Sequence, residues 1–82
     1  MESKNKKELQ KIADKLEVLE RQEKRDAGLN SINGGFAIIE MYNYDDNFIY
    51  VEVKVGVQCG GESDYTRVEN GRLNRETLGW AY

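Results

Sequence analysis

The sequence contains no histidine and a single cysteine, Cys59. Histidine is the usual general base near neutral pH and the commonest protein ligand for transition metals, so its absence argues against most acid–base and transition-metal enzymes. Cys59 has no histidine to activate it, and we interpret it as a structural or incidental thiol rather than a nucleophile. We therefore expect no enzymatic activity, no cofactor and no bound metal.

Long apolar runs and paired cysteines are missing as well. No segment approaches the ~18 apolar residues that a membrane span needs. The lysine-rich N-terminus is not followed by an apolar run, so the sequence shows no sign of a signal peptide. A small secreted domain would usually carry cysteines in pairs. Together these absences predict a cytoplasmic protein that does not enter a membrane.

Positive charge is scarce in the second part of the chain. Residues 1–35 carry eight Lys or Arg and seven Asp or Glu, whereas residues 36–82 carry four and eight. The net charges of +1 and −4 add up to the −3 of the whole chain. A protein that grips phosphates is normally basic on its binding surface, so the sequence argues against direct nucleic-acid binding.

The first ordered segment that the sequence predicts is a helix over residues 6–27. Its apolar residues form one narrow stripe, made of Leu9, Ile12, Leu16 and Leu19. Asn5 and Glu8 match a capping box at its start, and Gly28 is placed to end it in a left-handed conformation. The last turns, "ERQEKRD", contain no apolar residue, so we expect them to stand in water.

After a glycine-rich linker, residues 29–35, the apolar period changes from 3.6 to 2. "IYVEVKVGV" alternates cleanly, which predicts a half-buried strand with Ile49 and four valines on one face. "FAIIEMYNY" is its predicted hairpin partner, and a turn at residues 59–62 leads to a third strand, "SDYTRVE". The chain is therefore expected to be one α+β domain, residues 1–82. Its N-terminal helix would pack on a three- to four-stranded antiparallel β-meander at about residues 36–78.

Two outcomes remain open for residues 72–82. Asn70-Gly71 is typical of a tight hairpin turn, which predicts a fourth strand from Arg72 onward. A short helix that begins at Asn74 is the alternative.

The register of the first hairpin decides where its aromatic rings point. A loop of three or five residues puts three residues of the first strand with the valines under the helix, namely Ala37, Ile39 and Met41. The rings of Tyr42 and Tyr44 then lie on the outer face, whereas a loop of two or four residues turns them inward together with Glu40. Burying Glu40 alone costs more than the like-charge pair Glu40–Glu52 of the first register, so we predict the first register.

The second hairpin has one register that suits its turn. A Gly60-Gly61 turn pairs Gly56 with Tyr65, whose ring can cover the glycine. The same register pairs Val53 with Val68 in the core, and it sets Lys54 beside Arg67, which is unfavourable.

Three polar groups have simpler explanations than a site. Asp45-Asp46-Asn47 lacks the ligand spacing of a calcium loop and is typical of a hairpin turn. Glu40 and Glu52 could form an acid–base pair, but nothing else in the sequence supports one. Four lysines line one side of the helix, and we interpret them as a solvated face rather than a nucleic-acid or partner contact: Lys4, Lys7, Lys11 and Lys15.

The aromatic residues are concentrated, because four of the eight fall within residues 42–50. Clustered tyrosines on a sheet face are typical of an interaction site. We predict a partner-binding site on the outer face of the first hairpin, made of Tyr42, Tyr44, Phe48, Tyr50, Asp45, Asp46, Glu40 and Glu52. The alternative is that the C-terminal segment "LGWAY" folds back, so that Trp80 and Tyr82 cover the rings.

These features favour a small non-enzymatic inhibitor that acts by stoichiometric occlusion of a larger protein. Its acidic, tyrosine-rich face would dock on a basic groove, such as one that normally holds nucleic acid. A homodimer is expected too, because a small core is combined with exposed apolar surface.

The alternative is an oligomer that sequesters a small nucleotide. Its tyrosines would stack on the base, and the phosphates would meet the lysines of the helix or three arginines, Arg67, Arg72 and Arg75. A small enzyme is the third hypothesis and has the least support.

In size, charge and expected location, the chain is similar to the compact acidic inhibitors that phages and mobile elements encode against host defence enzymes. Anti-CRISPR proteins are one such group. This similarity of class implies a target such as an anti-phage nuclease and a site of action in the host cytoplasm. It rests on no sequence motif.

Overall fold

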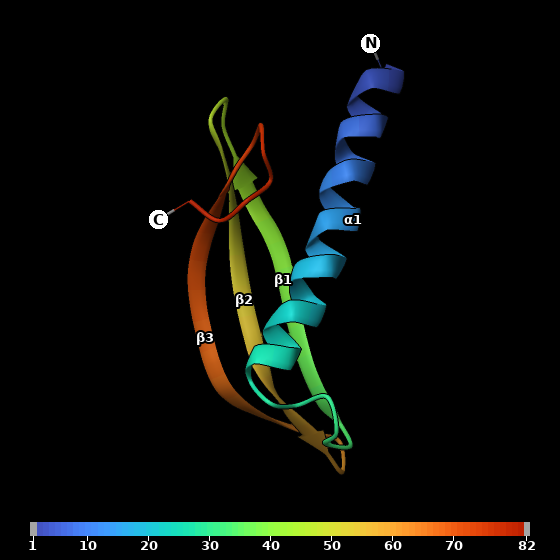
Figure 1. Ribbon diagram of the computed structural model, residues 1–82, viewed down its shortest axis with the longest axis vertical. Helices are drawn as coiled ribbons and strands as arrows, with labels where there is room; N and C mark the ends of the chain where they lie inside the picture. The colour runs from blue at the N-terminus through green and yellow to red at the C-terminus, as the bar shows by residue number, and fades with distance from the viewer. Residues whose placement is uncertain (1, 82) are drawn as a thin grey trace.

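The computed structural model describes residues 2–81, with side chains from Lys6 onward. One helix packs on a three-stranded antiparallel sheet with the strand order β1-β2-β3 (Figure 1). The elements are α1 (Glu2–Asp26), β1 (Gly35–Tyr44), β2 (Phe48–Cys59) and β3 (Glu62–Asn74). The α+β prediction, an N-terminal helix on an antiparallel meander, is confirmed.

The two ends of α1 differ in how well the sequence predicted them. The helix begins at Glu2, so Asn5 lies inside it and is not the N-cap; the side chain of Asn5 is outside the described part of the chain. Its C-terminal end is as predicted, because Gly28 adopts a φ of 72°. Leu29 N–H bonds to Lys24 O and Gly28 N–H to Arg25 O, each at 3.0 Å, which is the Schellman pattern.

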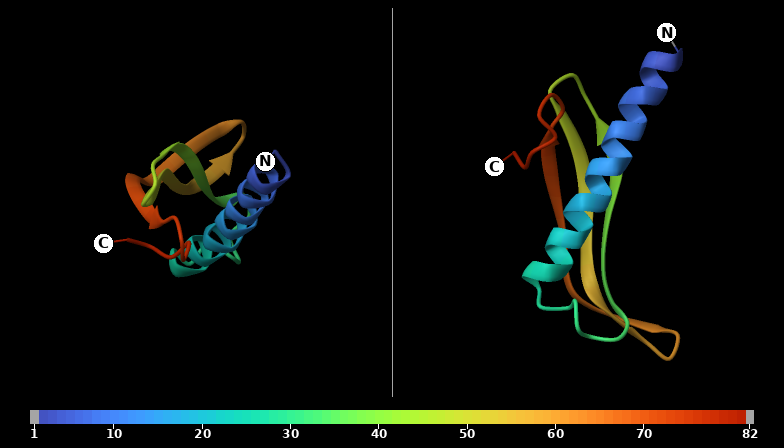
Figure 2. Two further views of the ribbon diagram at one scale, coloured as in Figure 1. Left: turned by 90° about the horizontal axis from the view of Figure 1, so that it is seen from above. Right: turned by 45° about the vertical axis from the view of Figure 1, so that its right-hand side comes forward.

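The core lies between α1 and the sheet. Its buried residues are Ile12, Leu19, Leu29, Ile39, Ile49, Val51, Val53, Val55 and Leu73. The alternation of β2 explains this set, since its odd-numbered residues face the helix. Figure 2 shows α1 on one face of the sheet and, within residues 2–81, no helix or strand on the other face. We call the uncovered side the outer face.

The helix is attached to the sheet mainly through its C-terminal half. Leu19 is 3% exposed, whereas Leu9, three turns earlier, is 53% exposed. The carboxylate of Glu20 accepts a hydrogen bond from Ile39 N–H at 2.9 Å, and Glu23 forms an ion pair with Arg67 at 2.7 Å. The N-terminal turns diverge from the sheet (Figure 1). The expectation that the last turns stand in water is therefore wrong for these two glutamates, because polar groups of the strands bind them.

The predicted β1–β2 register is confirmed up to residue 41. Ile39 faces Val53, Glu40 faces Glu52 and Met41 faces Val51. A β-bulge then inserts one extra residue, so that Asn43 faces Tyr50. An extra residue reverses the facing of everything beyond it in that strand.

The β2–β3 register is confirmed at Gly56, which faces Tyr65. Beyond it, a bulge shifts the pairing so that Lys54 faces Val68 and Val53 faces Glu69. The predicted Val53–Val68 pair is therefore wrong, and Val68 is 53% exposed. The shift also separates Lys54 from Arg67, which turns to the helix side and binds Glu23. This relieves the like-charge contact of the unshifted register.

Both predictions for the C-terminal segment are wrong. β3 runs through Asn70-Gly71 without a turn, and residues 75–77 form a turn instead of a helix. The chain reverses there, and Trp80 forms an isolated bridge with Leu73. The glycine at position 71 has a packing reason: a Cβ atom there would lie 3.0 Å from the Trp80 ring.

Candidate protein-binding face

The outer face carries the apolar and aromatic side chains that the helix does not cover. Pairing across the three strands assigns it these residues: Phe36, Ile38, Glu40 and Asn43 of β1; Phe48, Tyr50, Glu52 and Lys54 of β2; and Tyr65, Val68, Asn70 and Arg72 of β3. Tyr42 is the unpaired residue of the β1 bulge, and it lines the same depression as Tyr50, so we count it with this face. Four of these large side chains are more than a third exposed: Ile38, Tyr42, Tyr65 and Val68. An uncovered face with this composition is typical of an interaction surface.

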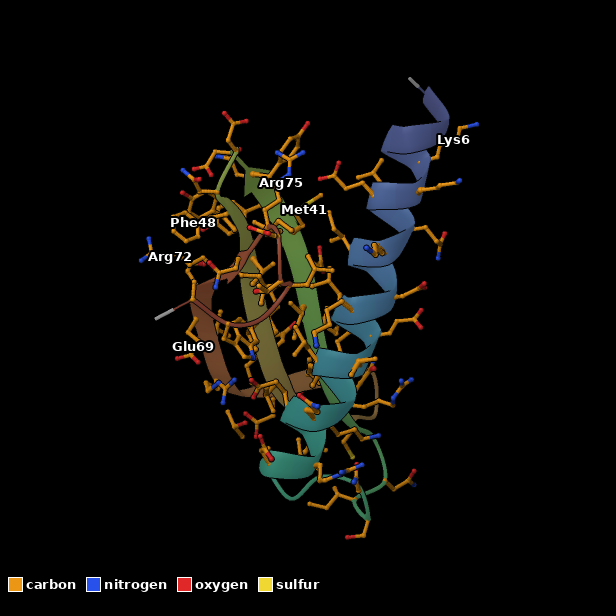
Figure 3. All side chains as sticks on the ribbon, turned by 45° about the horizontal axis from the view of Figure 1, so that its top comes forward. Lys6, Met41, Phe48, Glu69, Arg72 and Arg75 are labelled. Atoms are coloured by element: carbon orange, nitrogen blue, oxygen red, sulfur yellow. The ribbon has the colours of Figure 1, made fainter. Side chains whose placement is uncertain are left out.

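One cluster on this face lies near the β1–β2 turn. The rings of Phe48 and Tyr50 are 6.3 Å apart, and the Arg72 guanidinium lies 4.4 Å from the centre of the Phe48 ring. Figure 3 shows Phe48 and Arg72 close together, with Arg75 nearer to the helix. Tyr42 is 60% exposed at the β1 bulge. The register gives Phe48 and Tyr50 their predicted outward placement, and Tyr42 lines the same depression as Tyr50.

A second cluster lies at the other end of the sheet. Phe36 and Tyr65 flank Gly56 on the two sides of β2, and their rings meet edge to face at 5.8 Å. Gly56 is buried, and a Cβ atom there would collide with the carbonyl oxygen of Asp64, so glycine permits the close approach of the β3 backbone. The structure thus agrees with the inference that the Tyr65 ring covers this glycine.

Asp45 organises the β1–β2 turn. Its Oδ1 atom accepts hydrogen bonds from the backbone N–H groups of Asn47 (2.8 Å) and Phe48 (2.7 Å), and its Oδ2 atom accepts one from the Tyr50 hydroxyl (2.7 Å). The Tyr50 bond, followed by the two backbone bonds, lowers the pKa of Asp45. The same bond raises the pKa of Tyr50. Asp45 therefore acts as a turn residue that also fixes the Tyr50 ring.

The charge of the outer face is mixed rather than uniformly acidic. Glu40 is exposed, and Glu52 forms an ion pair with Lys54 at 3.4 Å. Glu69 of β3 lies on the helix side and pairs with Arg67 at 3.1 Å. Asp46 is exposed in the turn. The net charge is negative chiefly because of Glu40 and the turn.

Tyr44 lies on the helix side, which corrects its predicted outward position. The β1 bulge places it opposite Ile49, a core residue. Its ring lines a small cavity of about 190 Å³ beside Leu9 of the helix, and the Arg75 guanidinium lies 5.3 Å from the ring centre. Tyr44 is therefore not part of the outer face, although it is 58% exposed.

Arg75 was not recognised as a structural residue from the sequence. Its Nε donates to Glu8 Oε1 at 2.7 Å, its Nη1 donates to Asp45 O at 2.8 Å, and its backbone N–H donates to Asn47 O at 2.9 Å. Arg75 thus joins the helix, the β1–β2 turn and the C-terminal turn. The residues it connects are far apart in the sequence, so no local pattern marks it.

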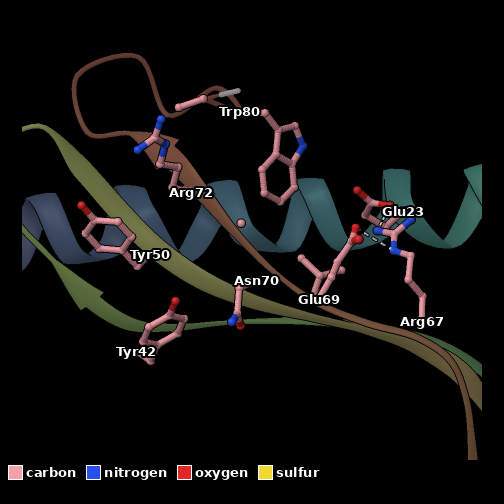
Figure 4. Close-up of a pocket in the computed structure, with 11 residues that line it drawn as sticks. Glu23, Tyr42, Tyr50, Arg67, Glu69, Asn70, Arg72 and Trp80 are labelled. Atoms are coloured by element: carbon pink, nitrogen blue, oxygen red, sulfur yellow. Dashed lines mark hydrogen bonds and ion pairs between the residues drawn. The ribbon is translucent and has the colours of Figure 1, made fainter.

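An open depression of about 460 Å³ follows the free edge of β3. Tyr42 and Tyr50 lie toward one end of it and the Glu23–Arg67 ion pair toward the other, with Trp80 between (Figure 4). Residues from both faces of the sheet line it, so it is a feature of the edge rather than a closed ligand cavity.

Trp80 does not cover the tyrosines of the outer face. It packs against the core and lies over Gly71, which shares the helix side with Val51. The predicted alternative, in which Trp80 folds back over the aromatic rings, is therefore wrong for this residue. Tyr82 lies outside the described residues.

Cys59 and the acidic residues are the remaining candidates from the sequence. Cys59 is exposed beside the β2–β3 turn. Among the described side chains, from Lys6 to Ala81, no three His, Cys, Asp or Glu are grouped in a way that could hold a metal ion. Within the same range, α1 is too polar to cross a membrane. What the outer face offers is exposed aromatic area and a few charges.

Comparisons of the chain with protein-family models, curated proteins and solved structures gave no match. The α+β fold and its uncovered face are therefore the features that bear on the function of this protein.

Proposed function

We propose that this protein is a non-enzymatic binding protein that occludes a larger protein through the outer face of its sheet. One observation carries the proposal: the helix covers one face of the sheet, while the other presents Tyr42, Tyr65, Ile38 and Val68 to solvent. Tyrosine and other large rings are favoured anchors in protein interfaces. The β-strands that carry these rings would hold them in place before binding, which reduces the entropic cost of association.

The partner surface that fits this face combines apolar pockets with positive charge. Glu40, Asp46 and the acidic second half of the chain favour a basic groove, such as one that normally holds nucleic acid. An anti-phage nuclease, blocked in the manner of anti-CRISPR proteins, is the concrete target that we propose. Glu40→Gln should then slow association and weaken its dependence on salt, as stopped-flow measurements with the purified target would show.

Tyr42 and Tyr44 provide a matched test. They are two positions apart, almost equally exposed, and on opposite faces of the sheet. Tyr42→Ala should weaken target binding by about 2 kcal/mol, roughly thirtyfold, because it removes an interface anchor. Tyr44→Ala should leave binding nearly unchanged.

The measurement begins with capture from a lysate of the cells in which the protein occurs, followed by mass spectrometry and titration calorimetry with the purified target. Circular dichroism melts of both variants exclude unfolding as the cause. Equal loss of binding in the two variants, or no loss in Tyr42→Ala, would refute the outer face as the binding site.

The nucleotide-sequestering alternative has less support, because two of the three arginines proposed to meet the phosphates are already in ion pairs. Arg67 is engaged by Glu23 and Arg75 by Glu8, which leaves Arg72 as the arginine beside the tyrosines. An ultraviolet-absorbing small molecule that co-purified with the protein would nevertheless favour that alternative over ours.

A further inference from the structure

The two edges of the sheet differ in how they are closed. On the free edge of β1, Ile39 N–H is bound by Glu20 of the helix. On β3, the C-terminal segment closes one end, where Ala81 N–H bonds to Arg72 O and Asn74 N–H bonds to Gly79 O. Unpaired strand edges are templates for further strands, and natural proteins usually cover them.

No segment within residues 2–81 covers the middle of the β3 edge. Backbone groups alternate in direction along a strand, and Arg72 and Asn74 point outward to the C-terminal segment. Asn70 and Val68 therefore point outward as well, and no described segment pairs with them. Arg67 and Glu69 pair inward with β2. The edge depression of about 460 Å³ is lined by Arg67, Glu69 and Asn70 among others.

We infer that this edge pairs with the same edge of a second copy, in an antiparallel ladder with Val68 on the two-fold axis. This inference is independent of the proposed function of the outer face. In this register each Val68 faces its own copy as a hydrogen-bonded pair, and Arg67 of each protomer faces Glu69 of the other. C2 pairing is the commonest way in which identical chains associate.

The charges of Arg67 and Glu69 favour this register, and they favour a second copy of the chain as the partner of the open β3 edge. An axis at Arg67 or Glu69 would set like charges opposite each other, whereas an axis at Val68 creates two opposite-charge pairs. The backbone groups of Arg67 and Glu69 bond to β2, so across the new ladder these residues would form non-hydrogen-bonded pairs. Such pairs have the shorter distance between opposite Cα atoms, which brings the opposite charges close together. Charged residues normally protect an edge, but here the sequence "RVE" is complementary to its own reverse.

The first experiment uses the wild-type protein alone. Sedimentation should show a monomer–dimer equilibrium, and hydrogen exchange followed by NMR should show amides of Val68 and Asn70 whose protection rises with concentration. The amides of Arg67 and Glu69 are internal controls, since they already face β2. A species of monomer mass at roughly hundreds of micromolar would overturn the proposal, as would a dimer in which Val68 and Asn70 exchange at a concentration-independent rate.

The second experiment exchanges the charges. Arg67→Glu and Glu69→Arg should each raise the dimer dissociation constant about tenfold or more, because each sets like charges across the axis twice. The double variant, Arg67→Glu with Glu69→Arg, should restore dimerisation. Glu23→Gln is the matched control, since it removes the intramolecular partner of Arg67 without altering the edge. Single variants that dimerise like the wild type, or a double variant that stays monomeric while folded, would overturn the register.

Discussion

Asp45 connects the conformation of a turn to the position of one aromatic ring, so its protonation has a predictable effect. The pKa of Asp45 is lowered in the folded state, first by the Tyr50 hydroxyl and then by two backbone N–H groups. A lowered pKa means that the carboxylate stabilises the fold fully above its unfolded pKa of about 3.9, and that this contribution is lost as pH falls through the folded value. Tyr50→Phe should reduce the acid sensitivity of the melting temperature below about pH 4, because it removes the largest cause of the shift.

The measurement is a series of thermal melts between neutral pH and about pH 2 for the wild type and Tyr50→Phe. Tyr44→Phe is the control, because Asp45 accepts its hydroxyl bond from Tyr50 and not from Tyr44. If the wild type and Tyr50→Phe lose stability in parallel, the Tyr50–Asp45 bond does not control acid stability.

Single residues also show which side-chain orientations the apolar alternation predicts and which it does not. Simple alternation placed Phe48 and Tyr50 correctly, because β2 continues without interruption through them. It failed for Tyr44 and Val68, because each lies beyond a bulge. A bulge adds a residue to one strand only, and the local apolar pattern of that strand does not reveal it.

The helix should contribute to stability unevenly along its length. Leu19 is buried over the sheet, so Leu19→Ala should lower the free energy of unfolding by about 3 kcal/mol through lost burial and a residual cavity. Leu9→Ala, the matched change at the end of the helix that stands away from the sheet, should cost about 0.5 kcal/mol. Urea titrations followed by circular dichroism measure both. Similar costs for the two variants would contradict the uneven attachment.

The elements were predictable where one local signal dominates. The valine alternation, the Gly60-Gly61 turn and the glycine end of the helix each follow from side-chain period or backbone freedom. Asn70-Gly71 was misread because glycine has two uses: it permits tight turns, and it leaves room for a neighbouring ring. Trp80, nine residues later, is that neighbour, and a contact of this kind is decided by tertiary packing.

Arg75 links three parts of the molecule that are separate in the sequence. Arg75→Ala should lower the melting temperature and increase hydrogen exchange in the β1–β2 turn, because the bonds to Glu8 and to Asp45 O are both lost. Arg75→Lys is the informative control: a lysine keeps the charge but does not reproduce the forked geometry with which a guanidinium donates to two groups. We expect Arg75→Lys to resemble Arg75→Ala in the turn while keeping more of the thermal stability. Unchanged exchange in both variants would show that the turn is ordered without Arg75.

The strand order β1-β2-β3 also determines how the chain can reach its folded state. Every strand pairs with the strand next to it in sequence, and each hairpin is closed by a short turn. The loops that must close to start each hairpin are therefore short, so their closure costs little entropy. We expect each hairpin to form its first backbone hydrogen bonds near the turn and the later ones progressively farther from it. β2 is the strand that both hairpins share. Docking of the helix would come afterwards, since the 29–34 connection allows α1 to search for the valine face once that face exists.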